Sequence, residues 1–302
     1  MQNVENGIIV IDKPPGITSA GVVAVVKRAL GLKKVGHAGT LDPFATGILV
    51  CLLSRATRLA RFLVAGVKTY EAELLLGVET DTEDLTGRVI SQRPVDRVTE
   101  AAIRAAAELW LGEIEQQPPV YSALKHEGRP LYELAREGRP VQKPPRKVTI
   151  SALTVLDVQL PRVRFRATCS PGTYIRTLGA DIGRELGCGG HLTALRRTVS
   201  SGFSLSDAVT LSVFETAVRE GARDRYILPM SAAMPDAPVF QADAQLAKDI
   251  RHGKPIPKSA AGPMATDGGG PIRVMTADRQ LAAILLDTAG ATDFEYGCVL
   301  LG

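Results

Sequence analysis

Alternation of apolar and polar residues is the clearest structural signal along this chain. Between residues 67 and 77, Tyr70 and Leu74 fall on one side of an extended chain, and Glu71 falls on the other. Residues 163–169 repeat the alternation, with arginines at 162, 164 and 166. A period of two is typical of a strand with one buried face. Both segments are therefore predicted as half-exposed strands.

Unbroken apolar runs predict further strands that are buried on both faces. One covers residues 7–11 and stops at Pro14-Pro15, since proline cannot donate to a sheet ladder. The others are predicted over residues 47–53 and 281–286, and a further strand is predicted over residues 191–199.

Helical spacing marks a different set of segments. Val22 and Val26 fall on one side of a helix that Thr18 or Ser19 would cap and Gly31 would end. Two more helices are predicted over residues 99–110, capped by Thr99, and 173–187.

Helices and strands do not alternate in regular βαβ units, which favours an α+β architecture over a doubly wound sheet. The composition becomes rich in Ala, Pro and Met near residues 229–238, a predicted boundary between domains. We expect a large domain over residues 1–232 and a small β-rich module over residues 236–302. The Gly-rich stretch 263–271 is predicted as a loop of that module.

Composition is ordinary for a globular chain of 302 residues, with 45 % hydrophobic and 23 % charged residues. Residues 1–6 lack a basic start followed by an apolar core, and no stretch approaches the roughly 20 apolar residues of a membrane span. We therefore expect a cytoplasmic protein without a membrane partner. Its four cysteines form no Cys-x-x-Cys pair, so they are interpreted as reduced buried thiols and no metal site is predicted.

Positive charge is concentrated in residues 118–147, which hold seven basic and three acidic side chains. Their excess equals the net charge of +4 of the whole chain. Such a segment suits contact with a phosphate backbone, although a solvated surface explains the charge equally well. The same two readings apply to Arg55, Arg58 and Arg61, which recur at helical spacing.

Candidate chemistry is concentrated in residues 36–47, Gly-His-Ala-Gly-Thr-Leu-Asp-Pro-Phe-Ala-Thr-Gly. Glycines allow positive φ and close approach of a ligand, and Pro43 favours an extended Asp42. The carboxylate of Asp42 is therefore expected on a rigid loop, where it could act as a nucleophile.

This block resembles the catalytic motif of the TruB family of pseudouridine synthases, although Ala38 and Phe44 stand where the family commonly has Thr and Leu. Four further blocks, in the family's order, resemble its other motifs. They are residues 6–19, residues 68–72 (Lys-Thr-Tyr-Glu-Ala), residues 118–125 (Pro-Pro-Val-Tyr-Ser-Ala-Leu-Lys) and residues 172–178 (Gly-Thr-Tyr-Ile-Arg-Thr-Leu). The resemblance covers nearly the whole chain and implies a mixed, mainly antiparallel sheet flanked by helices, followed by a PUA-like RNA-binding module.

The resemblance also implies roles for individual residues. Asp42 would be the catalytic carboxylate, Arg176 its ionic partner, and Tyr70 the platform that stacks on the target base. Further substrate contacts would come from His37, which would fill the space left by the extruded base, and from Tyr174, Leu195 and Lys13. Within 118–147, a mobile insertion in the family, the RNA backbone would be bound by Lys125, Arg129 and Arg146.

The implied activity is isomerisation of uridine 55 in the tRNA T-loop, with no cofactor and no obligatory protein partner, by a monomer. A guide-RNA-dependent pseudouridine synthase is one alternative. An RNA-binding protein or tRNA-folding chaperone that needs no catalysis is another. The combination of Asp42, Tyr70 and Arg176 argues against a purely binding role.

Overall fold

The computed structural model describes residues 6–261 and 270–301. Most of residues 1–6, and residues 263–269 of the predicted Gly-rich loop, lie outside these ranges. Within them, no helix is both long and apolar enough to cross a membrane.

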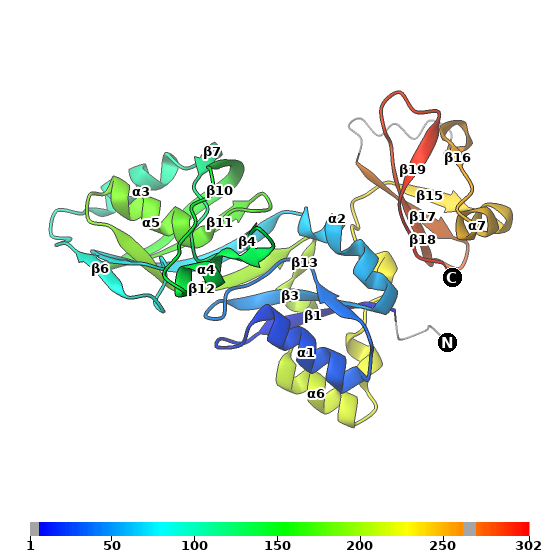
Figure 1. Cartoon of the computed structure of the whole chain (residues 1–302), viewed down its shortest axis with the longest axis horizontal. Helices are drawn as coiled ribbons and strands as arrows, with labels where there is room; N and C mark the ends of the chain where they lie inside the picture. The colour runs from blue at the N-terminus through cyan, green and yellow to red at the C-terminus, as the bar shows by residue number, and fades with distance from the viewer. Residues whose placement is uncertain (1–5, 262–269, 302) are drawn as a thin grey trace.

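One large mixed sheet forms the centre of the molecule (Figure 1). Its strands follow the order β14-β1-β3-β12-β4-β11-β10-β7, with β2 added to β3 and β13 added to β12. Neighbours are antiparallel except for the pairs β1–β14 and β3–β12. The expected α+β fold with a mainly antiparallel sheet is confirmed. The strands are β1 (Ile8–Lys13), β2 (Val35–His37), β3 (Thr46–Leu53), β4 (Lys68–Leu76), β7 (Gly112–Gln116), β10 (Arg146–Gln159), β11 (Arg162–Cys169), β12 (Gly190–Ser200), β13 (Phe203–Ser204) and β14 (Val209–Thr210).

The period-two pattern of β4 appears directly in its burial, since every second residue from Lys68 to Leu76 is buried. All residues of β3 after Thr46 are buried, as the apolar run predicts. Two short ribbons lie outside the large sheet: β5 (Val78–Thr80) with β6 (Val89–Gln92), and β8 (Lys125–His126) with β9 (Arg129–Pro130).

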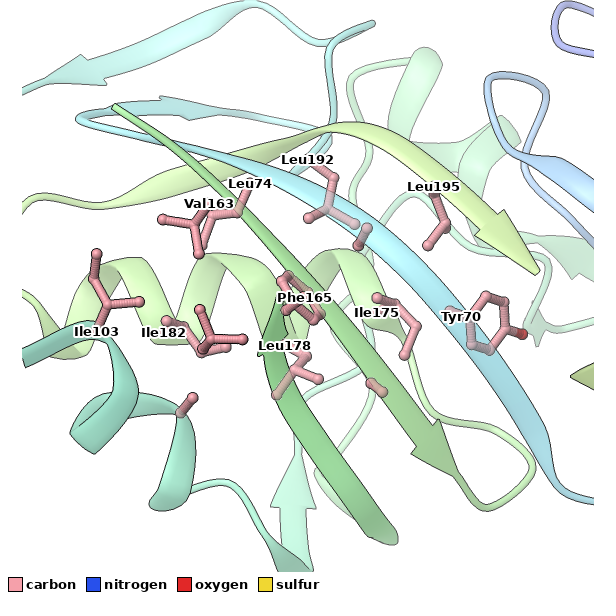
Figure 2. Close-up of a cluster of buried hydrophobic side chains, with 14 of the residues drawn as sticks. Tyr70, Leu74, Ile103, Val163, Phe165, Ile175, Leu178, Ile182, Leu192 and Leu195 are labelled. Carbon is pink, nitrogen blue, oxygen red and sulfur yellow. The ribbon is translucent and has the colours of Figure 1, made fainter. Parts of the chain in front are cut away.

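Helices cover the sheet in two places. α3 (Glu100–Glu108) and α5 (Ile175–Glu185) pack over β4, β10 and β12, and they enclose a cluster of buried apolar side chains (Figure 2). α1 (Ser19–Leu30) and α6 (Leu211–Arg219) lie side by side against the β1–β3 half of the sheet. The remaining helices are α2 (Ala60–Val64), α4 (Leu131–Arg136) and α7 (Ala244–Arg251).

Both predicted N-terminal caps are confirmed, whereas two of the three predicted helices are shorter than expected. The Thr18 hydroxyl accepts a hydrogen bond from the Gly21 amide, and Gly31 is left-handed with φ of 65°. Thr99 caps α3 in the same way, but α3 ends at Glu108, two residues before the predicted end. After Glu108 the chain turns toward β7, and Trp110 lies in this turn. α5 is also shorter than predicted, because its first residue, Ile175, follows an extended Tyr174.

The C-terminal module has its own sheet, in the order β15-β17-β18-β19-β16, and its own apolar core. Figure 1 shows it beside α2, away from α3 and α5. Leu281, Ile284 and Leu300 of this module join an apolar cluster with residues of β1 and β3. The module strands are β15 (Val239–Ala242), β16 (Ile256–Pro257), β17 (Pro271–Thr276), β18 (Leu281–Leu286) and β19 (Asp293–Val299).

Candidate active site

Asp42 lies on a loop that connects β2 to β3 and is tied down on both sides of the carboxylate. The Ser19 hydroxyl accepts from the Leu41 amide at 2.8 Å and donates to the Leu41 carbonyl at 3.0 Å. On the other side, the Pro43 carbonyl accepts from the Gly16 amide at 2.8 Å. These bonds hold the backbone, and the Asp42 side chain remains 35 % exposed. The loop therefore presents its carboxylate to a ligand.

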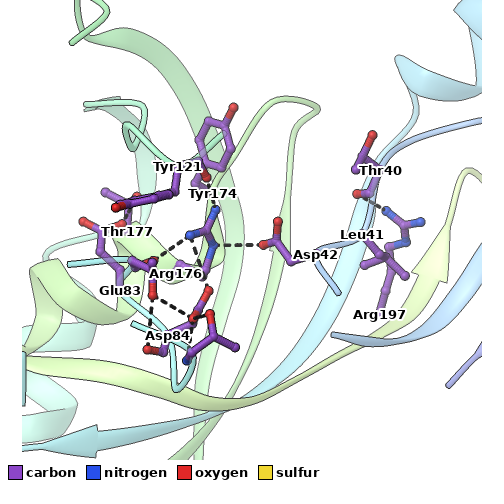
Figure 3. A network of polar contacts seen from close by, with 12 residues as sticks. Thr40, Leu41, Asp42, Glu83, Asp84, Tyr121, Tyr174, Arg176, Thr177 and Arg197 are labelled. Carbon is purple, nitrogen blue, oxygen red and sulfur yellow. Dashed lines mark hydrogen bonds and ion pairs between the residues drawn. The ribbon is translucent and has the colours of Figure 1, made fainter. Parts of the chain in front are cut away.

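Arg176 meets Asp42 across the site, as the sequence predicts (Figure 3). Its Nε lies 2.9 Å from Asp42 Oδ2, and its side chain is only 3 % exposed. The Nε–H has no aligned acceptor, so the contact is an ion pair rather than a directed hydrogen bond. The other guanidinium nitrogens donate to the carbonyls of Thr82 at 2.6 Å and Tyr121 at 2.7 Å. Arg176 is thus fixed by backbone groups independently of Asp42.

A buried carboxylate behind Arg176 was not predicted. Asp84 Oδ2 lies 3.5 Å from Arg176 Nη1, and its side chain is 5 % exposed. Its Oδ1 accepts from the hydroxyls of Thr82 and Thr86 and from the Thr86 amide. The sequence of residues 81–87 indicates only a polar turn. The usable signal was threonine two residues before and two after an aspartate, a spacing that lets local hydroxyls satisfy a buried carboxylate.

A cavity of about 340 Å³ opens beside this ion pair. Figure 2 shows Tyr70 and Leu195 near Ile175, at one end of the apolar cluster. Tyr70 is 9 % exposed, and burial raises the pKa of its hydroxyl. Predicted site residues that the structure brings together on this cavity are Asp42, Tyr70, Arg146, Tyr174, Arg176 and Leu195.

Lys13 and His37 do not line this cavity. Lys13 is fully buried, and its Nζ donates to the carbonyls of Pro14, Ile17 and Pro43 at 2.8–3.1 Å. Burial lowers its pKa to about 8, although the Asp42 charge opposes that change. Lys13 therefore supports the Asp42 loop from below rather than contacting a ligand. His37 lies half-buried on β2, and burial, followed by the Arg197 charge, lowers its pKa.

The basic segment is less free than its sequence suggests. Arg129 pairs with Glu137 at 2.5 Å, an exposed contact that also lowers the pKa of Glu137 to about 2. Arg146 donates to the Gly172 carbonyl and lies over the Tyr174 ring, 5.0 Å from its centre. Arg146 is thus part of the cavity wall, whereas Lys125 is exposed on β8.

Arg58 and Arg61 have a role that was not predicted, since the sequence suggested either phosphate contact or a solvated surface. Arg58 donates to the Val299 carbonyl at 2.5 Å, and Arg61 donates to the Gly297 carbonyl. Both acceptors belong to β19, so these arginines attach the C-terminal module to the large domain. Sequence could not reveal this, because the partners are backbone atoms more than 230 positions away.

The chain matches models of known protein families and the sequences of named proteins. A model described as the N-terminal domain of TruB family pseudouridylate synthases matches residues 27–175. A model described as the tRNA pseudouridylate synthase B C-terminal domain matches residues 176–235. A tRNA pseudouridine synthase B of Burkholderia pseudomallei (strain 668) is 45 % identical over 287 residues, which cover 94 % of each chain. One of Ralstonia pickettii (strain 12J) is 46 % identical over 264 residues, which cover 86 % of this chain and 82 % of the relative.

Solved structures share the fold of this chain. The chain superposes on a Cbf5-Nop10-Gar1 complex with a TM-score of 0.76 and 28 % identity, over 99 % of this chain and 86 % of that one. An H/ACA RNP bound to a substrate RNA containing 2′-deoxyuridine matches with a TM-score of 0.75 and 26 % identity, over 99 % and 86 % of the two chains.

Fold, site and matches together define a pseudouridine synthase, an isomerase that acts on uridine in RNA. Within that class, the chain belongs to the TruB family.

Proposed function

We propose that this enzyme converts uridine 55 in the T-loop of tRNA to pseudouridine. The supporting observation is the Asp42–Arg176 ion pair at the edge of a cavity that Tyr70 and Leu195 also line. The relatives at 45–46 % identity are named tRNA pseudouridine synthase B, which supports tRNA as the substrate. We expect the enzyme to act in the cytoplasm, where it would meet that substrate.

The reaction is an isomerisation. The C1′–N1 bond breaks with its electron pair on N1, the base rotates, and C5 bonds to C1′ while the C5 proton leaves and N1 gains one. Substrate and product have the same composition and oxidation state, so no cofactor is required. In both a covalent and a glycal route, the Asp42 carboxylate acts at the junction of sugar and base.

The apolar and aromatic walls would bind the extruded base. Tyr70 offers a flat face for stacking, with Tyr174 and Leu195 enclosing the ring. His37, outside the cavity, would contact the T-loop near the vacated position. Lys13 would act through the loop it supports.

We further propose that residues 118–147 contact the RNA backbone through Lys125 and Arg129, and that residues 236–302 form a PUA-like module that contacts tRNA. The start of the 118–147 segment reaches the site, since the Tyr121 carbonyl accepts from Arg176. RNA binding on the segment would thus act on the arginine that orients Asp42.

A stand-alone monomer is the form we propose. The solved structures titled as a Cbf5-Nop10-Gar1 complex and as a Nop10-Cbf5 complex are 28 % and 26 % identical to this chain, whereas the relatives named tRNA pseudouridine synthase B are 45–46 % identical. That contrast favours action without a guide RNA or partner protein.

Tritium release from a T-arm stem-loop RNA labelled at uridine C5 tests the proposal, with the purified chain as the sole macromolecule besides the RNA. We expect release that maps to position 55 and disappears when that uridine is replaced by cytidine. Turnover that starts only after a guide RNA or second protein is added would contradict a stand-alone enzyme. RNA binding without any release would favour a chaperone.

A further inference from the structure

Arg197 is a buried cation beneath the site. Its strand, β12, lies between β3 and β4, where Arg197 is opposite Gly47 on one side and Tyr70 on the other. The residue is only 1 % exposed. A charged side chain at such a position requires a specific set of partners, because burial of an unsatisfied cation is strongly unfavourable.

Those partners are backbone carbonyls of the catalytic loop and its neighbouring strand. Nε donates to the Ile48 carbonyl at 2.7 Å, Nη2 to the Gly39 carbonyl at 3.0 Å, and Nη1 to the Thr40 carbonyl at 3.4 Å. Figure 3 shows Arg197 directed at Thr40, on the side of Asp42 opposite Arg176. Ion pairs among the described residues include none to Arg197, so its charge is balanced by polar groups, chiefly these carbonyls, rather than by a carboxylate.

Two glycines lie against Arg197. Gly39, on the loop, has φ of 100°, a conformation that favours glycine, and a Cβ there would be in ordinary contact with Arg197 Nη1 at 3.4 Å. Gly47, on β3, has φ of 96°, and a Cβ there would lie 2.2 Å from the Arg197 carbonyl oxygen. A side chain at Gly47 would therefore push β3 away from the backbone of β12.

Arg197 also reaches the aromatic platform. Burial raises the pKa of the Tyr70 hydroxyl, and Arg197 opposes this rise through its charge and a hydrogen bond to the side chain. Arg197 is therefore bonded to the loop that carries Asp42 and is the cross-strand neighbour of Tyr70, the ring expected under the base.

We propose that Arg197 is a positioning residue that keeps the Asp42 loop and the Tyr70 ring in fixed relation while the base rotates between them. This assignment rests on the proposed function. Arg197 is 1 % exposed, and it borders the cavity at its inner wall rather than on the outer surface that would bind the RNA backbone, so its removal should slow the chemical step far more than it weakens RNA binding. Misplacement of reacting groups by about 1 Å can reduce a rate about 100-fold.

The test compares R197Q and R197K with the unaltered enzyme in single-turnover tritium release at saturating T-arm RNA, alongside RNA affinity and thermal stability. R197Q should lose roughly 100-fold in rate with an RNA Kd changed by less than about twofold. R197K keeps the cation but replaces the planar guanidinium, which donates from three separate nitrogens, with a single ammonium, so its rate should fall between those of R197Q and the unaltered enzyme.

The matched control is R273Q. Arg273 also donates to three backbone carbonyls, those of Ser231, Pro235 and Ala237, but at the join of the two domains. Loss of stability at the unaltered rate is expected for R273Q, which separates positioning from general damage.

A double-mutant cycle with Y70F supplies a further readout. If Arg197 acts partly through Tyr70, the rate losses of R197K and Y70F should not be additive. Unaltered single-turnover rates in folded R197Q and R197K would overturn the assignment, as would a loss confined to RNA affinity. If R197Q does not fold, the R197K rate decides in the same way. Failure of the unaltered enzyme to release tritium would instead contradict the proposed function.

Discussion

Asp42 is held by two independent systems, hydrogen bonds to its loop neighbours and an ion pair to its carboxylate. Its loop neighbours are fixed to Ser19, Gly16 and Lys13, and Arg176 approaches from another element. Backbone carbonyls hold Arg176 in place, so the position of Arg176 does not depend on Asp42. The arginine can therefore orient the Asp42 carboxylate. Such preorganisation is what electrostatic and nucleophilic catalysis require.

Lys13 provides a pH-dependent test of the loop support. Its folded-state pKa, lowered by burial to about 8, lies below the ordinary value of 10.5. Between these values the unfolded chain binds more protons than the folded one, so the free energy of unfolding contributed by this residue rises with pH. Urea titrations of the K13M variant from pH 7 to pH 10 should show a smaller rise than the unaltered protein.

Lys68, whose pKa burial also lowers to about 8, is present in both proteins, so the comparison isolates Lys13. The same rise in both would show that Lys13 does not titrate in this range.

At the scale of elements, the site is assembled where β3, β4 and β12 meet under one loop. Gly47 has no room for a side chain at this junction, because a Cβ there would lie 2.2 Å from the backbone carbonyl oxygen of Arg197 on the parallel neighbour. The parallel pairing of β3 with β12 therefore depends on a residue without a side chain.

The G47A variant should lose more than about 3 kcal/mol of unfolding free energy, from left-handed strain plus a backbone clash. Gly221 has φ of 72° but open space around its α-carbon, so G221A should lose only about 1–2 kcal/mol. Equal losses in chemical denaturation would mean that the β3–β12 junction tolerates a methyl group.

Sequence predicts the elements of this site better than their contacts. Alternation locates β4 and the side of it that carries Tyr70, and the loop motif locates Asp42. Arg197 escapes prediction because Arg196-Arg197 looks like an exposed pair, and only the sheet register shows which of the two is buried. Asp84 escapes for a different reason, because its partner Arg176 is 92 positions away along the chain.

For the whole molecule, the relation between the two domains depends on side chains of the large domain that bind an edge of the small one. Arg58 and Arg61 donate to carbonyls of β19, and a Cβ on Gly297 would lie 2.7 Å from the Phe62 ring. These contacts fix the position of the module on the large domain.

The double variant R58Q/R61Q should release the module. Proteinase K is expected to cleave it faster within residues 229–238, with fragments identified by mass, while tritium release from a short T-arm RNA continues. R251Q, on exposed α7 of the same module, is the control. Unchanged protection in the double variant would show that the apolar contacts alone hold the domains together.

The central claim is that Asp42 performs chemistry at a site whose RNA affinity comes from other groups. Tritium release from C5-labelled T-arm RNA should be abolished in D42N, with RNA affinity nearly unchanged, because binding and catalysis use different side chains. Residual turnover near the unaltered rate, or a parallel loss of RNA binding, would contradict the account.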